Sequence, residues 1–169
     1  MSKKVVMIIA GINFRDEEYK VPRAILEKAG VEIKVASSVT KPCRGVLGMT
    51  VTPDILISEI NVGDYEAIIF VGGGGSSEYW NNETALSIAR ECIKLDKLLC
   101  AICIAPVTLA NAGVLNGKKA TVFSSEIARL KNKGVNYTGR DVEIDGKIIT
   151  ANGPAAAGKF GEAIAKALE

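Results

Sequence analysis

The chain has 169 residues, of which 48% are apolar and 24% are charged, and its formal net charge is +2. This length suits one folded domain with a substantial core, and the mean hydropathy of +0.21 excludes intrinsic disorder. The near balance of charges gives no reason to expect nucleic acid as a partner. The sequence contains no histidine, which excludes histidine-based catalytic triads and histidine metal ligands.

No apolar run approaches the roughly 20 residues that cross a bilayer, so we expect no membrane partner. Residues 5–10 are apolar, but Gly11 and a charged segment follow them in place of a small-residue cleavage site. We interpret this run as a first strand and expect a cytoplasmic protein. A domain of this size needs no disulfide, so we expect reduced thiols. The cysteines are Cys43, Cys92, Cys100 and Cys103.

The predicted strands are short apolar runs, several of them continuous, as expected for strands that are buried on both faces. In chain order they cover residues 5–9, 31–36, 46–51, 67–71, 98–102 and 120–123. Near the end of the chain, residues 142–144 and 147–150 flank Asp145-Gly146, a two-residue turn signal that predicts a hairpin.

Helices with one apolar face alternate with these strands. The first ends at Gly30 and the last begins at Gly153-Pro154. Shorter helical stretches are expected after Pro53-Asp54 and after Cys103. The predicted inward-facing residues of the longer helices are Val21, Ile25 and Ala29, then Leu86, Ala89 and Ile93, then Phe160, Ile164 and Leu168.

This alternation predicts a flavodoxin-like α/β fold, a three-layer sandwich with a mainly parallel sheet and helices on both faces. No internal repeat or low-complexity linker interrupts the pattern, so residues 1–169 are expected to form one domain. In an open parallel sheet, functional sites form at the carboxyl ends of the strands. Three segments lie there: the acidic residues after the first strand, the glycine run after Val71 and the turn at Cys103.

Cys103 lies between an apolar strand and a helix. Ala101 and Ala105 are small residues two positions before and after it, as a sharp nucleophile elbow requires, and Pro106 suits the first turn of a helix. A helix amino terminus favours a thiolate over a thiol, so we expect the pKa of Cys103 to lie well below about 8.5. The alternative is an inert cysteine buried in an apolar strand.

Cys100 and Cys103 also form a C-x-x-C pair. If Cys100 lies in an extended strand, the two Cα atoms are about 10 Å apart. A disulfide requires less than about 7 Å, so we interpret Cys100 as a packing residue.

The other two segments offer an acid and backbone amides. Carboxylates in a first helical turn complement the helix dipole, which is a sufficient account of Asp16 and Glu17, but one of the three acidic residues at positions 16–18 is able to reach Cys103 and share a proton with it. The glycines at 72–75 lack the Walker A and G-x-G-x-x-G patterns. Their amides are able to form an oxyanion hole, and a plain flexible turn is the alternative.

Four motifs occur along the chain, in the order Glu18 with Pro22, Gly72 with Gly73, residues 101–106 and residues 149–154. Together they make the chain resemble the PfpI superfamily, which has a class I glutamine amidotransferase-like fold. The elbow of that family reads Ala-Ile-Cys-x-Gly-Pro, and Ala105 occupies the glycine position here.

The resemblance implies that Cys103 is the nucleophile and that the carboxyl group of Glu18 hydrogen-bonds its sulfur. It places the oxyanion and substrate-binding groups at Gly72, Gly73 and Ile104, with the amides of Gly73 and Ile104 forming the pocket. It further implies a homodimer or a higher homo-oligomer, and a cysteine that oxidises readily to a sulfinate held by a protonated glutamate. A glutamate beside a thiolate in a partly desolvated pocket should have a raised pKa.

The sequence also departs from the family pattern. Ile104 stands where the peptidase branch has a histidine, and Phe123 stands where the deglycase-like branch often keeps one. Neither side chain activates a thiol, so a Cys–His peptidase is disfavoured. Ala105 in place of glycine and Val71 in place of proline are smaller departures.

Two functions of different classes follow. In the first, a glyoxalase- or deglycase-like enzyme, Cys103 attacks a small reactive aldehyde, Glu18 moves a proton between adjacent carbons, and a hydroxy acid leaves after thioester hydrolysis. This chemistry requires no metal or organic cofactor. The alternative is a non-catalytic redox sensor or protective protein, in which an oxidant converts Cys103 to sulfenate and sulfinate. An intracellular cysteine peptidase comes last, and a member that only binds a metabolite remains open.

Overall fold

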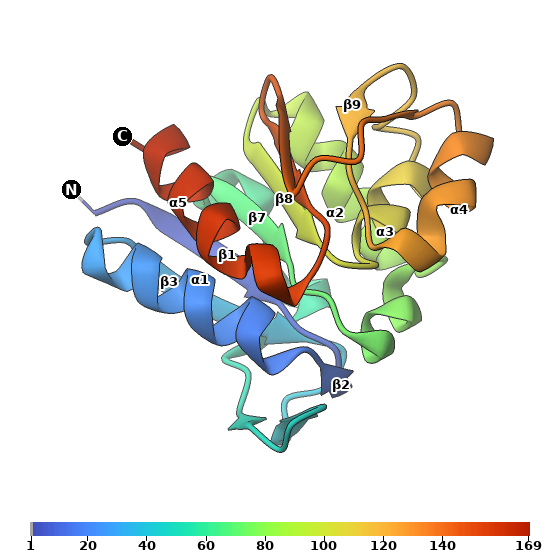
Figure 1. Cartoon of the computed structure of the whole chain (residues 1–169). Helices are drawn as coiled ribbons and strands as arrows, with labels where there is room; N and C mark the ends of the chain where they lie inside the picture. The colour runs from blue at the N-terminus through green and yellow to red at the C-terminus, as the bar shows by residue number, and fades with distance from the viewer. Residues whose placement is uncertain (1) are drawn as a thin grey trace.

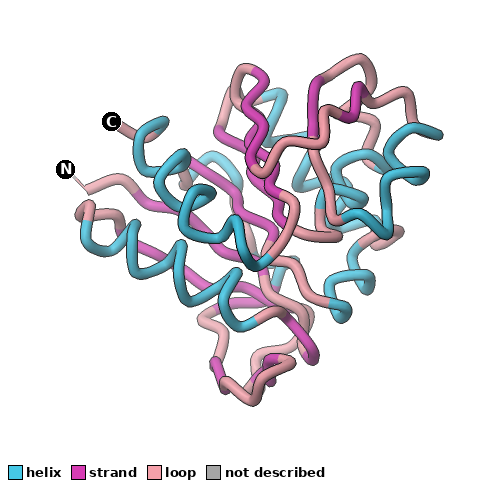
Figure 2. The backbone as a smooth tube through the Cα atoms, in the orientation of Figure 1, coloured by secondary structure: helices cyan, strands magenta, loops and turns pink. Residues whose placement is uncertain are grey.

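The computed structural model describes residues 2–169 (Figures 1 and 2). Its central layer is a seven-stranded sheet in the order β11-β12-β8-β7-β1-β3-β6. Neighbouring strands are parallel except β11 and β12, which form the predicted hairpin. The mainly parallel sheet is therefore confirmed. Its strands are β1 (Lys4–Ile8), β3 (Glu32–Ser37), β6 (Ile55–Leu56), β7 (Ala67–Phe70), β8 (Leu98–Ile102), β11 (Val142–Asp145) and β12 (Ile148–Ala151).

Helices cover both faces of this sheet, which confirms the flavodoxin-like sandwich. In β1, Val5 and Met7 face the layer of α1 and α5, whereas Val6 and Ile8 face the layer of α2 and α3, because successive strand residues point to opposite faces. Figure 1 shows α1 and α5 side by side, with both chain ends on the same side of the molecule. The helices are α1 (Asp16–Lys28), α2 (Glu83–Lys94), α3 (Pro106–Asn111), α4 (Ile127–Asn132) and α5 (Ala157–Ala167).

Shorter elements connect these layers. One three-stranded sheet joins β2 (Ile12–Phe14), β4 (Cys43–Gly45) and β5 (Thr50–Val51), and β9 (Lys119–Ala120) pairs with β10 (Asn136–Tyr137). The 3-10 helices are η1 (Ile57–Glu59), η2 (Val62–Asp64), η3 (Gly74–Tyr79), η4 (Ser124–Glu126) and η5 (Pro154–Ala156). No helix among residues 2–169 is both long and apolar enough to span a bilayer.

The strand predicted at residues 46–51 is wrong. These residues mostly form the turn between β4 and β5, where Val46 and Leu47 are exposed and Gly48 has a φ of +98°. Asp16 holds this turn, because its carboxylate accepts hydrogen bonds from the amides of Leu47 (3.0 Å) and Met49 (2.9 Å). Asp16 is itself buried, so the helix dipole is not a sufficient account of it.

The edge strand of the main sheet lies further along the chain. After Pro53-Asp54, where a helical stretch was predicted, Ile55 and Leu56 pair with β3 as β6, and only the short 3-10 turns η1 and η2 follow before β7. The amide of Val35 in β3 donates to the Asp54 carboxylate at 2.8 Å, which aligns the two segments. Of the extended structure predicted at residues 120–123, only Ala120 belongs to a strand.

The predicted helix faces are right in part. Phe160, Ile164 and Leu168 are buried as expected, as are Leu86 and Ala89, but Ile93 is 38% exposed near the end of α2. In α1, Val21 and Ile25 are half-buried and Ala29 is exposed, whereas the buried residues are Asp16, Glu18, Tyr19, Pro22 and Leu26. Apolar spacing misplaces this face because two of its buried residues are acidic.

Candidate functional site

Cys103 lies at the carboxyl end of β8, between that strand and α3, in a strained backbone conformation. Its φ is +67°, in the left-handed region that residues with side chains rarely adopt. Its amide donates to the carbonyl of Ala151 in β12 at 2.9 Å, and its carbonyl accepts from the amide of Phe123 at 2.8 Å. These contacts hold a sharp strand-to-helix turn at Cys103.

The carboxyl group of Glu18 lies next to this thiol. Glu18 is fully buried in the first turn of α1, and its side chain and Cys103 both approach Gly72. A Cβ atom on Gly72 would collide with the Glu18 carboxyl and would lie 2.5 Å from both the Cys103 Cβ and the Ile102 carbonyl oxygen. Glycine at position 72 is therefore what allows the carboxyl and the thiol to meet.

Burial determines the protonation of Glu18. Neither carboxyl oxygen has a partner with hydrogen-bond geometry among residues 2–169, and the nearest polar groups are the Cys103 thiol and the Gly72 backbone. Burial raises the pKa of Glu18 to about 8, although the Cys103 contact and the charge of Arg15 lower it in part. At neutral pH the carboxyl is therefore mostly protonated, as the sequence predicted.

The pKa of Cys103 moves in the direction opposite to the one expected. Burial, followed by the neighbouring Glu18, raises it to about 12, while the amides of Gly73 and Ile104 lower it. Cys103 is only 8% exposed, and α3 has only six residues, so desolvation outweighs the helix terminus. Since the two acids share one buried site, they lose their protons as a coupled pair.

The amides of Gly73 and Ile104 both face the Cys103 sulfur. Gly73 has a φ of +99°, and the Ser76 hydroxyl donates to its carbonyl at 2.7 Å. The indole Nε1 of Trp80 donates to the carbonyl of Ile104 at 3.1 Å. The carbonyls that share a peptide group with the two amides, those of Gly72 and Cys103, accept from the amides of Arg15 (2.9 Å) and Phe123 (2.8 Å), so both peptide groups are held in place.

A pocket of about 530 Å³ opens at Cys103, and Gly73 and Ile104 line it as well. Phe123 forms part of its wall, so the position expected for a family histidine holds an aromatic ring. Glu18 does not line the pocket but lies behind Cys103. The structure thus brings Cys103, Glu18, Gly72, Gly73 and Ile104 together.

Sequence reasoning missed four polar residues that line this pocket, namely Asn13, Arg15, Ser125 and Glu126. Asn13 has a φ of +63°, which places a second strained residue beside Cys103. Only Arg15 could have been predicted as a site residue, because it stands next to the acidic run, whereas nothing in the sequence marks Glu126. Glu17, the middle acid of that run, pairs with Arg15.

The other cysteines have no comparable surroundings. Cys43, Cys92 and Cys100 are fully buried, and no cysteine of the described chain is in a disulfide. Burial raises the pKa of Cys100 well above its usual range, and its side chain packs in the core, as predicted. No group of three or more His, Cys, Asp or Glu side chains within residues 2–169 is arranged to hold a metal ion.

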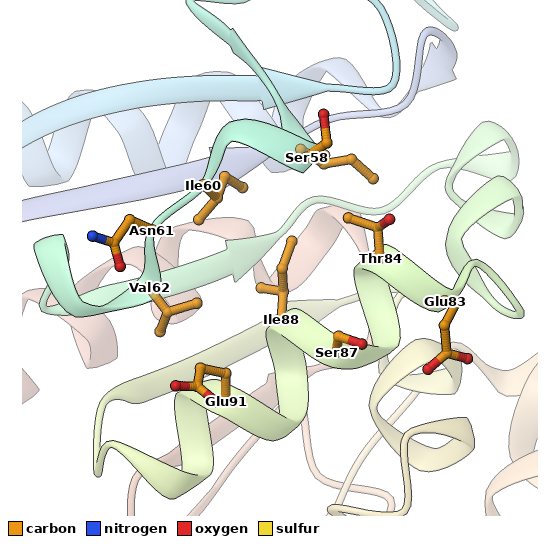
Figure 3. Close-up of a pocket in the computed structure, with 10 residues that line it drawn as sticks. Ser58, Ile60, Asn61, Val62, Glu83, Thr84, Ser87, Ile88 and Glu91 are labelled. Carbon is orange, nitrogen blue, oxygen red and sulfur yellow. The ribbon is translucent and has the colours of Figure 1, made fainter.

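A second pocket of about 460 Å³ lies between α2 and the segment of η1 and η2 (Figure 3). Figure 3 shows apolar Ile60, Val62 and Ile88 together with Ser87 and Glu91. It contains none of the predicted site residues and no cysteine, so the candidate chemistry lies at Cys103.

The fold and the site define an α/β protein with a strained cysteine and a buried glutamate at the carboxyl ends of a parallel sheet. A model of the DJ-1/PfpI family matches residues 3–167, and the chain belongs to this family. The resemblance found in the sequence is thereby confirmed.

Individual relatives match over most of the chain. A protein of Methanocaldococcus jannaschii is 44% identical over 98% of this chain and 82% of its own length. Deglycase PfpI of Pyrococcus furiosus is 30% identical over 88% of this chain and 90% of its own. The crystal structure of a ThiJ/PfpI domain protein from Brachyspira murdochii gives a TM-score of 0.96 at 30% identity, covering 99% of this chain and 96% of that one.

Proposed function

We propose that this chain is a cysteine-dependent protective enzyme that acts on small reactive aldehydes, as a glyoxalase or a deglycase does. The observation that carries the proposal is that the buried carboxyl of Glu18 lies next to the thiol of Cys103, which lines the pocket. A relative named deglycase, 30% identical to this chain, supports an enzymatic role.

The first step joins the substrate to the sulfur. As Cys103 attacks the aldehyde carbon of a 2-oxoaldehyde, the ionised form of Glu18 accepts the thiol proton, and the amides of Gly73 and Ile104 stabilise the developing oxyanion. The oxyanion then takes this proton from Glu18 to give a hemithioacetal, which returns Glu18 to its ionised form. A carboxyl whose pKa lies at about 8 suits this exchange, because acid–base catalysis is most effective near the operating pH.

The second step is an isomerisation. Glu18 removes the proton from the carbon bonded to sulfur and returns a proton to the neighbouring carbon, so the first carbon is oxidised and the second is reduced. The product is the thioester of a 2-hydroxy acid. Water cleaves the thioester, which releases the hydroxy acid and restores the thiol. Electrons balance within the substrate, so the scheme uses no external oxidant or reductant.

The test is turnover of methylglyoxal and glyoxal, followed as aldehyde loss and hydroxy-acid formation. We expect Cys103→Ser to abolish turnover and Glu18→Gln to reduce it by about 100-fold or more. Cys100→Ala, from the buried part of the same strand, is the control and should retain turnover. Full activity of Cys103→Ser, or no turnover by the wild type, would overturn the proposal.

The second candidate is a redox sensor, and the donors around the sulfur favour it. A protonated Glu18 and the amides of Gly73 and Ile104 supply the hydrogen bonds that sulfinate oxygens need. Intact-mass measurement after peroxide treatment should then show two added oxygens in the wild type and a lower yield in Glu18→Gln. Equal yields would contradict the role of the carboxyl. A peptidase stays disfavoured, because a chain without histidine offers no base of the Cys–His kind.

A further inference from the structure

Arg15 brings a positive charge into the pocket of Cys103. It is the residue immediately before α1, and it lines the same cavity as Cys103. Its amide donates to the carbonyl of Gly72 at 2.9 Å, which fixes its backbone to the glycine pair of the site. The guanidinium is close enough to Glu18 for its charge to lower that carboxyl's pKa.

Glu17 holds the Arg15 side chain in place without using all of its donors. Nε and Nη2 of Arg15 each donate to a Glu17 carboxylate oxygen at 2.9 Å, so the pair is bidentate. Nη1 makes no hydrogen bond to any of residues 2–169, and the Arg15 side chain is 33% exposed. A guanidinium has five N–H donors on a planar fork, so one edge remains available to a second anion.

The other acidic groups near the pocket do not take up that edge. Glu126 lines the pocket, but its carboxylate already accepts from Arg129 Nε at 2.9 Å and from the Ser125 hydroxyl at 2.6 Å. Glu18 is mostly protonated at neutral pH. Ile104 and Phe123 contribute apolar wall.

We propose that Arg15 is a specificity-determining residue, which makes the site prefer aldehydes that carry a carboxylate. This inference rests on the proposed function. The substrate class is a 2-oxoaldehyde with a carboxylate on its distal carbon, which Arg15 holds while the aldehyde carbon meets Cys103. Addition of one water converts such a compound into a hydroxy diacid, by the same internal oxidation and reduction.

The first test needs no turnover. Iodoacetate and iodoacetamide both alkylate a thiol with loss of iodide, but only iodoacetate carries a carboxylate. The ratio of their rates at Cys103, measured by peptide mass spectrometry, cancels any change in thiolate population. We expect Arg15→Met to lower the ratio of iodoacetate to iodoacetamide rates about tenfold, and Arg15→Lys to keep part of it. Lys20→Met, which removes an exposed positive charge five residues further along the chain, should leave the ratio unchanged.

The second test compares turnover of 4,5-dioxopentanoate with that of its methyl ester. We expect wild-type kcat/KM to favour the acid about tenfold, and Arg15→Met to remove the preference through a higher KM for the acid. An unchanged alkylation ratio in Arg15→Met, or equal use of acid and ester by the wild type, would overturn the inference. If neither aldehyde turns over but the alkylation ratio falls in Arg15→Met, the proposed enzyme fails while the selection of anions by Arg15 stands.

Discussion

The side chains of Glu18 and Cys103 both approach the backbone of Gly72, which leaves no room for a side chain at position 72. Any side chain there would enter the space that the carboxyl, the thiol and the Ile102 carbonyl already fill. The neighbouring Gly73 is required for two reasons: its φ of +99° is in the left-handed region, with its amide facing the sulfur, and a Cβ there would lie 2.5 Å from the Asn13 carbonyl oxygen. Both glycines therefore provide space, and Gly73 also orients its amide.

Gly72→Ala should destabilise the protein by about 1 to 3 kcal/mol, because the added methyl group meets a backbone carbonyl that cannot rotate away. Urea unfolding measures the loss. Gly74→Ala is the matched control: a Cβ there meets nothing within 4 Å, so its unfolding midpoint should stay close to that of the wild type. Equal midpoints for both variants would refute the steric account.

Glu18→Gln should flatten the dependence of stability on pH. The pKa of Glu18 is raised from 4.5 to about 8 in the folded state, so the folded protein holds this proton more tightly than the unfolded chain. Stability linked to Glu18 is complete below pH 4.5 and is lost as pH rises to about 8, by about 1 kcal/mol per pH unit. Denaturant unfolding of both proteins at pH 5, 6.5 and 8 tests this, and parallel pH profiles would contradict it.

At the scale of elements, the close packing of α5 on α1 fixes the helix that carries Glu18. Gly161 of α5 faces Pro22 of α1, and a Cβ on it would lie 2.9 Å from the Pro22 Cα and 3.0 Å from the Ile25 Cδ1. Pro22 also lacks an amide hydrogen, so the Glu18 carbonyl has no donor four residues later in its helix. The Glu18 and Pro22 motif thus combines a site residue with a helix contact.

Two glycines of α5 allow a matched comparison of this packing. Alanine is favoured over glycine in a helix by about 1 kcal/mol, and Gly158→Ala should show that gain because its added methyl meets nothing within 4 Å. Gly161→Ala should instead lose stability, since the contact with Pro22 outweighs propensity. Thermal unfolding measures both changes, and stabilisation by Gly161→Ala would show that α1 and α5 separate easily.

At the scale of the whole molecule, the sheet determines which thiol is available. Cys92 and Cys100 are enclosed between the layers, and Cys43 is fully buried at the start of β4. Cys103 alone of the four is found among the residues that line the described pockets. The position of each cysteine in the fold therefore determines whether its thiol is accessible.

Iodoacetamide should accordingly add one group to the native protein, at Cys103, and four groups to the unfolded chain. Intact-mass analysis of the wild type and of Cys103→Ser provides the measurement. Rapid native labelling of the Cys103→Ser variant would mean that the core opens more readily than its burial indicates.

The main sheet and the principal site residues were predictable from the sequence for a physical reason. Continuous apolar runs mark strands buried on both faces, and parallel strands bring their carboxyl ends to one edge, so Cys103 and the 72–75 glycines were expected at the same edge of the sheet. The acidic run before α1 adjoins the same edge. Topology indicated this edge of the sheet, whereas the choice of Glu18 among the three acids and of the Gly73 and Ile104 amides came from the family resemblance.

The remaining features depend on contacts that no local pattern encodes. The apolar residues at 46–51 fit a strand, but the Asp16 carboxylate binds their amides and leaves Val46 and Leu47 exposed. The pKa of Cys103 is raised and not lowered because burial has a larger effect on it than the amino terminus of a short helix. Arg15 lines the pocket because the loop before α1 passes beside it.

The chain has a single tryptophan, and it lies at the site. The indole of Trp80 hydrogen-bonds the carbonyl of Ile104, the residue after Cys103, and the Arg129 guanidinium lies 4.7 Å from its ring centroid. Emission from an indole changes when its hydrogen bond or a nearby cation shifts. Intrinsic fluorescence of the unlabelled protein is therefore a direct optical signal for a molecule entering the pocket or for modification of its sulfur.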